Sequence, residues 1–302
     1  MRWRKVGACA LVLFLSGWVH AAHITGVGSV SLAVSDLDRS VVFYTQILSF
    51  KRVSQSMFQD MKVARLQLGD EFIDLRQYSS RKGRAPQADY RSNDRYFQHV
   101  AIIVSDMDQA YAVLQKNKVR SVSSGPQRLP DWNKNAGGIK AFYFKDPDGH
   151  PLEILQFPPD KGDPKWQQKK RLFLGIDHTA IVVGSTEKSL AFYRDRLGFA
   201  VKGESINYGI EQERLNNVGG ARLHITGLRA GQGPGIEFLE YITPKDGRPY
   251  PEDALPDDLI FTETVLVSES PTADCNQATI DCLLRDPDGH AVMITEGSHA
   301  EK

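Results

Sequence analysis

The sequence has few cysteines, no excess of charge of either sign and no uncharged apolar run long enough to span a membrane. Three cysteines among 302 residues exclude a disulfide-dense scaffold, and none belongs to a Cys-x-x-Cys pair of a zinc ribbon. Lys plus Arg and Asp plus Glu both number 37, so no global charge favours binding to nucleic acid or to an acidic membrane surface. Hydrophobic residues make up 41% and charged residues 25%, which excludes a disordered or fibrous chain. A globular protein of about two domains, at ~150 residues each, remains.

The first residues have the pattern of a secretory signal. Three basic residues within positions 2–5 precede an uncharged run over 6–19, and small residues follow at Ala21 and Ala22. A basic start, a short apolar core and a small-residue exit are typical of a cleaved signal, and the run is short for a membrane span. We therefore expect residues 1–21 to be removed and the mature protein to be periplasmic or secreted, with no membrane association. An uncleaved N-terminal anchor is the alternative.

The rest of the chain repeats itself. The segment 38–44, Asp-Arg-Ser-Val-Val-Phe-Tyr, recurs over 187–193 as Glu-Lys-Ser-Leu-Ala-Phe-Tyr. The pentapeptide Asp-Pro-Asp-Gly-His occupies 146–150 and again 286–290. Such internal similarity defines the architectural unit of a fold.

Each unit has the pattern of a strand, a helix and three further strands. Alternating stretches such as 30–34 and 100–104 predict the first strands, and Ser35 and Ser105 then offer helix-capping oxygens. The Asp-Pro-Asp-Gly turns predict hairpins between the last two strands. We expect four such units, spanning 24–78, 95–157, 174–243 and 257–296.

The fourth unit is shorter than the others, and we expect it to lack its helix. In chain order, the four units make two domains of an α+β fold, 24–157 and 174–296. The polar segments between the units, rich in Pro, Gly and Lys, have the composition of linkers.

Four β-α-β-β-β units resemble the vicinal oxygen chelate superfamily. The resemblance is carried by Gly-Ile-Asp-His at 175–178, which opens the third unit, and by Asp-Pro-Asp-Gly-His-Pro-Leu-Glu at 146–153, which closes the second. The superfamily includes glyoxalase I, methylmalonyl-CoA epimerase, extradiol dioxygenases and bleomycin- or fosfomycin-resistance proteins. The resemblance covers nearly all of the chain after residue 21 and implies paired half-barrel domains. Because one scaffold hosts several chemistries, these motifs specify the fold more than the reaction.

In this superfamily the metal ligands come from the first and last strands of two paired units. The resemblance places at the first-strand position Ser29, His99, His178 and Thr262. It places at the last-strand position Asp74, Glu153, Glu237 and Met293. Only the second and third units keep both a His and a Glu. We therefore expect the two middle units to pair and the outer units to form a structural half, although extradiol enzymes pair their units in sequence.

The chemistry of the four residues supports the same site. His99, Glu153, His178 and Glu237 each lie in an apolar strand, and burying an unpaired carboxylate costs several kcal/mol. Two neutral imidazoles and two carboxylates balance a divalent cation such as Ni²⁺, Co²⁺, Fe²⁺, Mn²⁺ or Zn²⁺. For any one of these residues alone, an outward-facing surface position is the alternative.

The resemblance implies a metal-dependent lyase or isomerase of the glyoxalase I type, or an epimerase, acting on a small carbonyl compound. The metal would stabilise an enediolate while Glu153 or Glu237 moves the proton. Two alternatives stay open: an extradiol-type ring-cleavage dioxygenase, and a non-catalytic, resistance-type binding protein. The partner is a small molecule in each case, and the protein is a monomer or a homodimer.

Three pairs of residues are lesser candidates. Asn217 and Arg222, near the middle of the third unit, are candidate substrate contacts. A turn is the preferred explanation of Asn217, and an exposed strand position explains Arg222 equally well. His150 and His290 follow tight turns, where we expect solvent exposure. Cys275 and Cys282 flank a short loop of the fourth unit, and export would place them in an oxidising compartment, where they are candidates for a disulfide bond.

Overall fold

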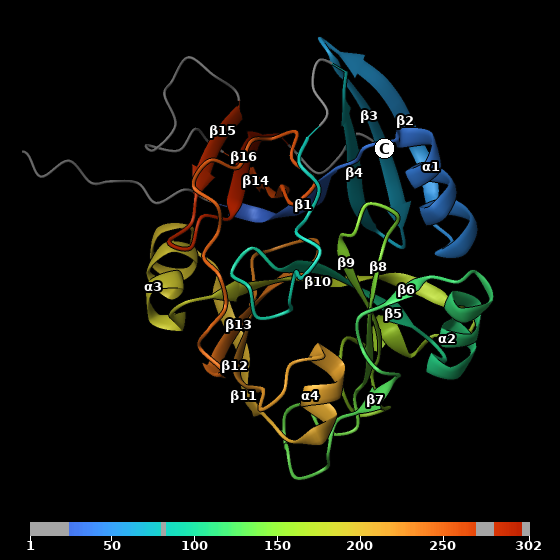
Figure 1. The fold of residues 1–302 in the computed structure, drawn as a ribbon, viewed down its shortest axis with the longest axis vertical. Coiled ribbons are helices and arrows are strands. Elements are labelled where there is room, and N and C mark those ends of the chain that lie inside the picture. Colours follow the sequence, from blue (N-terminus) through green and yellow to red (C-terminus); the bar gives the residue numbers. More distant parts are fainter. Residues whose placement is uncertain (1–23, 80–82, 270–280, 298–302) are drawn as a thin grey trace, which may run out of the picture.

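The computed structural model describes residues 24–79, 83–269 and 281–297 (Figure 1). Among these residues no helix is both long and apolar enough to cross a bilayer. The predicted signal segment, 1–21, lies outside the described residues. Cys282 is disulfide-bonded, and Cys275, its expected partner, also lies outside them.

The first and second units follow the predicted order of strand, helix and further strands. The first comprises β1 (Ile24–Ala33), α1 (Leu37–Val42), the π-helical turn η1 (Phe43–Ile47), β2 (Lys51–Phe58), β3 (Met61–Leu68) and β4 (Glu71–Tyr78). The second comprises β5 (Gln98–Val104), α2 (Met107–Lys116), β6 (Arg120–Ser121), β7 (Gln127–Arg128), β8 (Lys140–Lys145) and β9 (Pro151–Gln156).

The third unit has an additional helix and the fourth consists of strands. A short helix, η2 (Pro164–Gln167), lies in the linker before the third unit. The third unit comprises β10 (Phe173–Val183), α3 (Thr186–Leu190), η3 (Ala191–Arg196), β11 (Ala200–Asn207), α4 (Ile210–Asn216), β12 (Arg222–Arg229) and β13 (Gly235–Thr243). The fourth comprises β14 (Thr262–Ser268), β15 (Asp281–Arg285) and β16 (Ala291–Glu296), with no helix in its described part.

The first helices of the first and second units begin one residue later than the capping serines Ser35 and Ser105 predicted. Asp36 and Asp106 are the N-caps of α1 and α2, and each carboxylate accepts a hydrogen bond from a first-turn backbone N–H. Ser185 caps α3 in the same way. A carboxylate at this position also interacts favourably with the helix dipole, which explains why Asp rather than the preceding Ser is used.

The units combine into two sheets, and each sheet takes its strands from two units. The seven-stranded sheet, in the order β15-β16-β14-β1-β4-β3-β2, joins the fourth unit to the first. The nine-stranded sheet, with the order β11-β12-β13-β10-β5-β9-β8-β6 and β7 beside β8, joins the third unit to the second. Figure 1 shows the blue and red strands in one sheet and the green to orange strands in the other. The predicted pairing of the middle units is confirmed.

The division in chain order, 24–157 and 174–296, therefore does not correspond to the sheets. In every unit the last strand pairs in parallel with one edge of the first strand, so the other edge of the first strand needs a partner. That partner is the first strand of another unit. β1 of the first unit pairs with β14 of the fourth, and β5 of the second unit pairs with β10 of the third, both antiparallel. Each of the two chain halves thus contributes one unit to each sheet.

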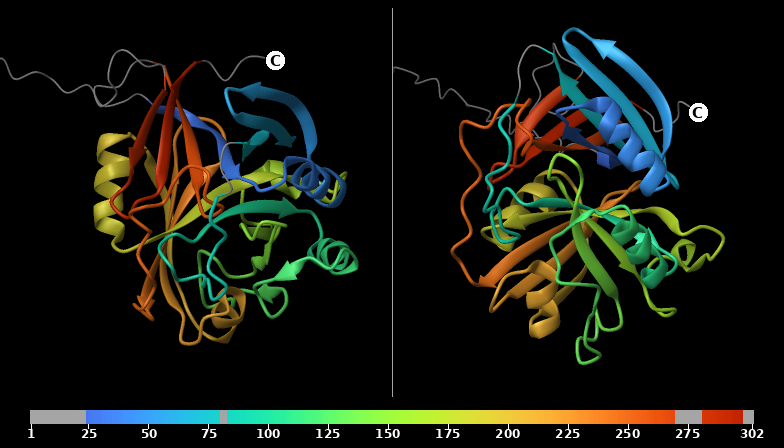
Figure 2. Two further views of the ribbon diagram at one scale, coloured as in Figure 1. Left: turned by 45° about the horizontal axis from the view of Figure 1, so that its top comes forward. Right: turned by 45° about the vertical axis from the view of Figure 1, so that its right-hand side comes forward.

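Two hydrophobic cores connect the units in the other direction. One core packs the first unit, through Val30 and Leu75, against Ile102 and Phe142 of the second. The other packs the third unit against the fourth, with Phe238 and Leu266 among its members. Every unit therefore shares a sheet with one unit and a core with another, so the four units form a closed ring (Figure 2).

The Asp-Pro-Asp-Gly-His turns bind the even-numbered units to the preceding ones. Asp146 accepts a hydrogen bond from Tyr44 of the first unit (3.1 Å) and pairs with His150 Nδ1 (2.8 Å). The same arrangement recurs between the third and fourth units, in Asp286, Tyr193 (3.3 Å) and His290 (2.9 Å). The two histidines are 4% and 1% exposed, so the expectation that they face solvent is wrong. The turn needs them inside because the imidazole balances the buried carboxylate.

Two linkers, 83–97 and 244–261, lie against each other and are joined by reciprocal ion pairs. Arg84 of the first linker pairs with Asp258 of the second (Nη2–Oδ2 2.7 Å). Arg248 of the second pairs with Asp94 of the first (Nη2–Oδ2 2.6 Å). We call these two pairs the linker clasp.

The glycine before each clasp arginine is required by close packing of the two backbones. A Cβ at Gly83 would overlap the carbonyl of Asp257, and a Cβ at Gly247 would overlap the carbonyl of Asn93. The repeated Gly-Arg pairs of the linkers thus have the same purpose in both copies.

Candidate metal centre

Four side chains that the sequence predicted as ligands lie on one face of the nine-stranded sheet. His99, Glu153, His178 and Glu237 come from β5, β9, β10 and β13, which are adjacent in the order β13-β10-β5-β9. Glu153 lies opposite Ala101 and Glu237 opposite Ala180, in each case two residues beyond the histidine of the paired strand. Because side chains alternate between faces with a period of two, each His and Glu share a face.

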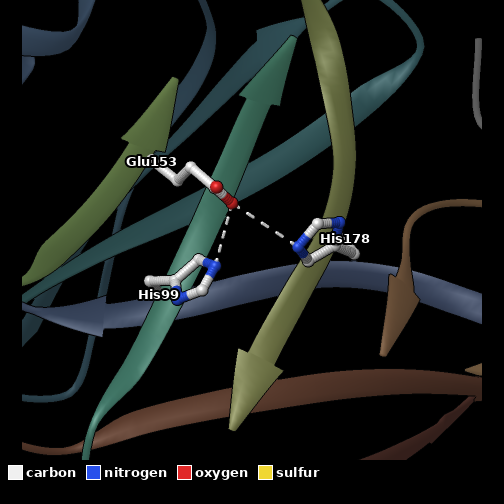
Figure 3. A group of neighbouring side chains, drawn as sticks. All are labelled: His99, Glu153 and His178. Carbon is white, nitrogen blue, oxygen red and sulfur yellow. Dashed lines mark hydrogen bonds and ion pairs between the residues drawn. The ribbon is translucent and has the colours of Figure 1, made fainter. Parts of the chain in front are cut away.

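The side chains of His99, Glu153 and His178 converge on a common point (Figure 3). His99 Nε2 lies 3.1 Å from Glu153 Oε2, and His178 Nε2 lies 3.7 Å from the same oxygen. On its other side, His178 Nε2 lies 3.6 Å from Glu237 Oε1. One ligand atom from each of His99, Glu153 and His178 lies within 4.8 Å of the others, so these three form the compact part of the cluster.

Burial differs among the four residues and defines an open side. His99, Glu153 and His178 are 1%, 4% and 6% exposed, whereas the Glu237 side chain is 25% exposed. A molecule that approaches the cluster from solvent therefore meets Glu237 first.

A β-bulge in β10 brings an additional carboxylate to the cluster. The pairing of β10 with β5 shifts between Ile176 and His178, so Asp177 and His178 do not point to opposite faces as regular alternation would require. Asp177 Oδ2 is 2.9 Å from His178 Nδ1. The other Asp177 oxygen accepts hydrogen bonds from Trp166 Nε1 (3.0 Å) and Arg229 Nη2 (2.6 Å).

This carboxylate fixes the orientation of His178. A hydrogen bond from Nδ1 to Asp177 turns Nε2 toward Glu153 and Glu237, and second-sphere carboxylates orient metal-binding histidines in this way. His99 has no such partner, since its Nδ1 is buried without a hydrogen bond. The two imidazoles are thus held unequally.

The charges of the cluster match those of a cation site. Burial lowers the pKa of His178, but Glu237, Asp177 and Glu153 outweigh this effect and raise it to about 9. Burial raises the pKa of Glu237 to about 7, and burial lowers the pKa of His99. His178 Nε2 is buried without a hydrogen-bond partner and lies between two carboxylates. The residues present therefore fit a divalent cation held by imidazole and carboxylate ligands.

The two sides of the cluster differ in bulk. Tyr143 lies opposite Glu153 on β8, and its ring centroid is 4.8 Å from that of His99. At the corresponding place on β12, opposite Glu237, stands Gly227, and a Cβ there would have no heavy atom closer than 3.9 Å. Space is therefore available beside Glu237 and not beside Glu153.

The corresponding place in the seven-stranded sheet holds an ion pair. Ser29 donates a hydrogen bond to Asp74 (2.6 Å), as the predicted positions require, and Arg65 binds the same carboxylate with 2.8 and 3.0 Å contacts. Arg65 lies opposite Asp74 on β3, where Tyr143 and Gly227 stand in the other sheet. A guanidinium thus supplies the positive charge that a metal would supply in the middle units.

In the fourth unit the residue equivalent to His99 is Glu263 and not the predicted Thr262. His99 lies opposite Ala180, two residues after His178, and Glu263 lies opposite Ser31, two residues after Ser29. Met293 lies on β16, as expected. Thr262 and Glu263 are adjacent in β14, so their side chains point to opposite faces of the sheet.

Asn217 and Arg222 lie away from the cluster. Both are exposed; Asn217 ends α4 in a left-handed conformation, with φ at 53°. Arg222 stacks over Tyr208 at 5.4 Å, five residues along β12 from Gly227, or about 16 Å at ~3.3 Å per residue. The neighbouring Asn216 is buried and donates a hydrogen bond to the hydroxyl of Tyr241 (2.6 Å).

Three residues of the site had no signal of their own in the sequence. Trp166 lies in a linker, Arg229 ends a strand, and Asp177 would face away from His178 in a regular strand. The one available indication was that Asp177 directly precedes His178 in the Gly-Ile-Asp-His motif.

Comparison with known proteins yields a family and several similar folds. The family model of the glyoxalase/bleomycin resistance protein/dioxygenase superfamily matches residues 22–154 and 175–294. The metallothiol transferase FosB of Staphylococcus epidermidis is 28% identical over 134 residues, which cover 44% of this chain and 82% of FosB.

Solved structures resemble the whole arrangement. Glyoxalase I from Zea mays superposes with a TM-score of 0.60 at 16% identity, over 90% of this chain and 92% of that one. A putative dioxygenase from Bacillus subtilis gives a TM-score of 0.58 at 13% identity, over 93% and 88%. At these identities the likeness concerns the fold alone.

Proposed function

Because the chain belongs to the glyoxalase/bleomycin resistance protein/dioxygenase superfamily, we propose that it is an exported, metal-dependent enzyme that moves a proton next to the carbonyl group of a small substrate. The reaction class is that of a glyoxalase-like or epimerase-like lyase or isomerase. The observation that supports it most is the convergence of His99, Glu153 and His178, with Glu237 on their solvent side.

The roles of the four residues follow from their burial and contacts. His99, Glu153 and His178 hold the metal, because they are the three buried groups whose ligand atoms lie close together. A divalent metal at this site supplies Lewis-acid polarisation of a carbonyl oxygen. The contribution of the protein is to fix these three side chains, with Asp177 orienting His178.

Glu237 is the residue that moves the proton. It is the most exposed of the four, it borders the space at Gly227, and its Oε1 lies 3.6 Å from His178 Nε2. A carboxylate in this place takes a proton from a carbon of a substrate bound over Gly227 and returns it to the neighbouring carbon or to the opposite face.

Solvent proton exchange tests this assignment without knowledge of the natural substrate. We expect the purified, metal-loaded protein to incorporate deuterium from D₂O next to the carbonyl group of some member of a panel of 2-oxo and 2-hydroxy carbonyl compounds, as followed by NMR. Glu237→Gln should reduce exchange by about 10²- to 10⁴-fold and keep the bound metal. His99→Ala and His178→Ala should lose the metal, whereas Ser29→Ala, at the matching place in the other sheet, should retain both.

A ring-cleavage dioxygenase is the second candidate. Its support is that the compact ligand set consists of two imidazoles and one carboxylate, the combination used by non-haem Fe(II) oxygenases. Bound iron together with oxygen consumption on catechols, and no deuterium exchange in the panel, would overturn the proton-transfer proposal in favour of this one. A protein without metal and without turnover would instead be a binding protein.

Export is part of the proposal and rests on the sequence of residues 1–21. N-terminal sequencing of the protein from its native compartment should begin at Ala22 or within a residue or two. Recovery of intact Met1 in the soluble fraction would contradict it.

A further inference from the structure

A second cluster of metal-binding side chains lies on the opposite face of the third unit. Glu240 is three residues beyond Glu237 on β13, so it faces away from the central site. Opposite it on β12 stands His224, whose Nδ1 is 4.0 Å from Glu240 Oε2. On the other side of the imidazole, Nε2 is 3.3 Å from Oε1 of Glu204 on β11.

These residues line a cavity of about 430 Å³ between α3 and the sheet. Thr186, the first residue of α3, lines the same cavity and is 6% exposed. Its hydroxyl is buried and has no hydrogen-bond partner. A buried hydroxyl without a partner is costly, and a polar group or a water in the cavity would satisfy it.

The repeated units show that this cluster is not required by the fold. In the first unit the positions of Glu204, His224 and Glu240 are occupied by Gln55, Lys62 and Gln77. In the second unit, Lys140 and Gln156 occupy the last two positions. The position of Thr186 is Leu37 in the first unit and Met107 in the second.

At the position of Glu240, glutamine links the sheet to the start of the helix as well as glutamate does. Gln77 accepts a hydrogen bond from the backbone N–H of Leu37 (2.9 Å), and Glu240 accepts one from that of Thr186 (3.0 Å). Gln156 binds the start of α2 in the same manner (3.0 Å). Linking the sheet to the helix therefore does not explain why the third unit has carboxylates and an imidazole.

We propose that His224 and Glu204 bind a second divalent metal ion, of the kind that prefers imidazole and carboxylate ligands, such as Zn²⁺ or Co²⁺. The 3.3 Å between His224 Nε2 and Glu204 Oε1 is the separation of two neighbouring ligands that each lie about 2.0–2.2 Å from one ion. Glu240 adds negative charge 4.0 Å from the other ring nitrogen, and waters in the cavity complete the coordination and satisfy the Thr186 hydroxyl.

The test replaces the cluster by the residues of the first unit. The variant Glu204→Gln/His224→Lys/Glu240→Gln keeps the sheet-to-helix hydrogen bond and should fold as the wild type does, with the same thermal midpoint. Calorimetric titration of the full chain with Zn²⁺ should give two equivalents for the wild type and one for this variant. His99→Ala/His178→Ala should lose the other equivalent, so failure of either site is distinguishable from failure of the other.

A matched control addresses charge alone. Gln77→Glu introduces a carboxylate at the Glu240 position of the first unit, opposite Lys62, and should add no zinc equivalent. If the triple variant does not fold, Glu204→Gln alone is the test. This variant should fold, because Glu204 is half exposed and its replacement disturbs no core, and it should lose the second zinc equivalent because it lacks the proposed carboxylate ligand. A single equivalent in the wild type, or two in either cluster variant, would overturn the proposal.

Discussion

At the scale of the residue, Asp177 shows how one irregularity in a strand determines the chemistry of a site. The bulge at Ile176–His178 turns both Asp177 and His178 to the same side, and two donors, Trp166 and Arg229, then hold the carboxylate in place. Three side chains from β10, η2 and β12, namely Asp177, Trp166 and Arg229, thereby define the direction of His178 Nε2.

Asp177→Asn should weaken zinc binding at the central site by about 10- to 100-fold. The amide orients the imidazole less strongly than the carboxylate does, and the substitution removes a negative charge near the metal. The measurement is a competition titration with a chelator. Trp166→Phe, which removes the Nε1 hydrogen bond to Asp177 and keeps an aromatic side chain, should have a smaller effect in the same direction. Equal affinity in the wild type and in Asp177→Asn would show that the bulge has no such purpose.

Gly227→Leu should abolish turnover and leave metal binding unchanged, because the added side chain would fill the space beside Glu237, which is not one of the three proposed ligands. Metal analysis and the deuterium-exchange assay on the same preparation distinguish the two effects. Gly203, where a Cβ would also meet nothing within 4 Å, offers the control: Gly203→Ala should keep both properties.

The residue scale is also where sequence reasoning reached its limit. The four central residues were predictable because the resemblance to the superfamily implies ligands on the first and last strands of each unit, and the internal repeat indicates where those strands lie. Glu263 was not predictable as the position equivalent to His99, because the fourth unit lacks the helix motif that sets the register of the other units. Asp177 was not predictable, since a bulge has no signal in a pattern of alternating residues.

At the scale of the element, the Asp-Pro-Asp-Gly-His hairpins act as ionised anchors. Burial lowers the pKa of His150, but the Asp146 carboxylate outweighs this effect and raises it; burial raises the pKa of Asp146, and His150 together with backbone hydrogen bonds lowers it. His290 and Asp286 show the same directions for the same reasons.

The stability supplied by the hairpin should therefore depend on pH. A raised His pKa stabilises the fold fully below the unfolded value of about 6.5, and this contribution is lost as the pH rises through the folded value. A lowered Asp pKa stabilises the fold above about 3.9, and that contribution is lost as the pH falls. His150→Gln should accordingly reduce the free energy of unfolding more at pH 6 than at pH 9, as measured by urea denaturation. In the Asp146→Asn background the difference between the two pH values should be absent.

The elements themselves were largely predictable. The repeated helical motif predicted the helices of the first and third units, and the paired turns predicted the last hairpins of the second and fourth units. The helices of the first two units begin one residue later than predicted because Ser35 and Asp36 are both good caps, as are Ser105 and Asp106. The additional helix α4 was missed, since no repeat marks it.

At the scale of the whole molecule, the linker clasp joins two segments that the sequence presents only as polar connections. Asp94 and Asp258 are 0% and 1% exposed, so each depends on its arginine for compensation. The two pairs are related by the internal symmetry of the chain and hold the same two backbones together.

Arg84→Ala and Arg248→Ala should each lower the midpoint of thermal unfolding, because each leaves a buried carboxylate without its cation. The double variant should lower it by less than the sum, since opening one pair already separates the linkers from which the other is built. Arg128→Ala, which removes an exposed local pair with Asp131, should change little. Strict additivity would show that the two pairs act independently.

The interlaced pairing of the units has a consequence for synthesis. Thr25, at the start of the first unit, bonds the carbonyl of Val267, and 242 residues separate them in the chain. β1 is therefore synthesised first but pairs with β14, which is synthesised near the end. Until β14 is made, one edge of β1 has unpaired backbone hydrogen-bonding groups. Contacts of such long sequence separation slow folding and expose unpaired strands to aggregation. We expect chains that stop before β14 to require a chaperone or to aggregate, even though the nine-stranded sheet that carries the central site is already complete in them.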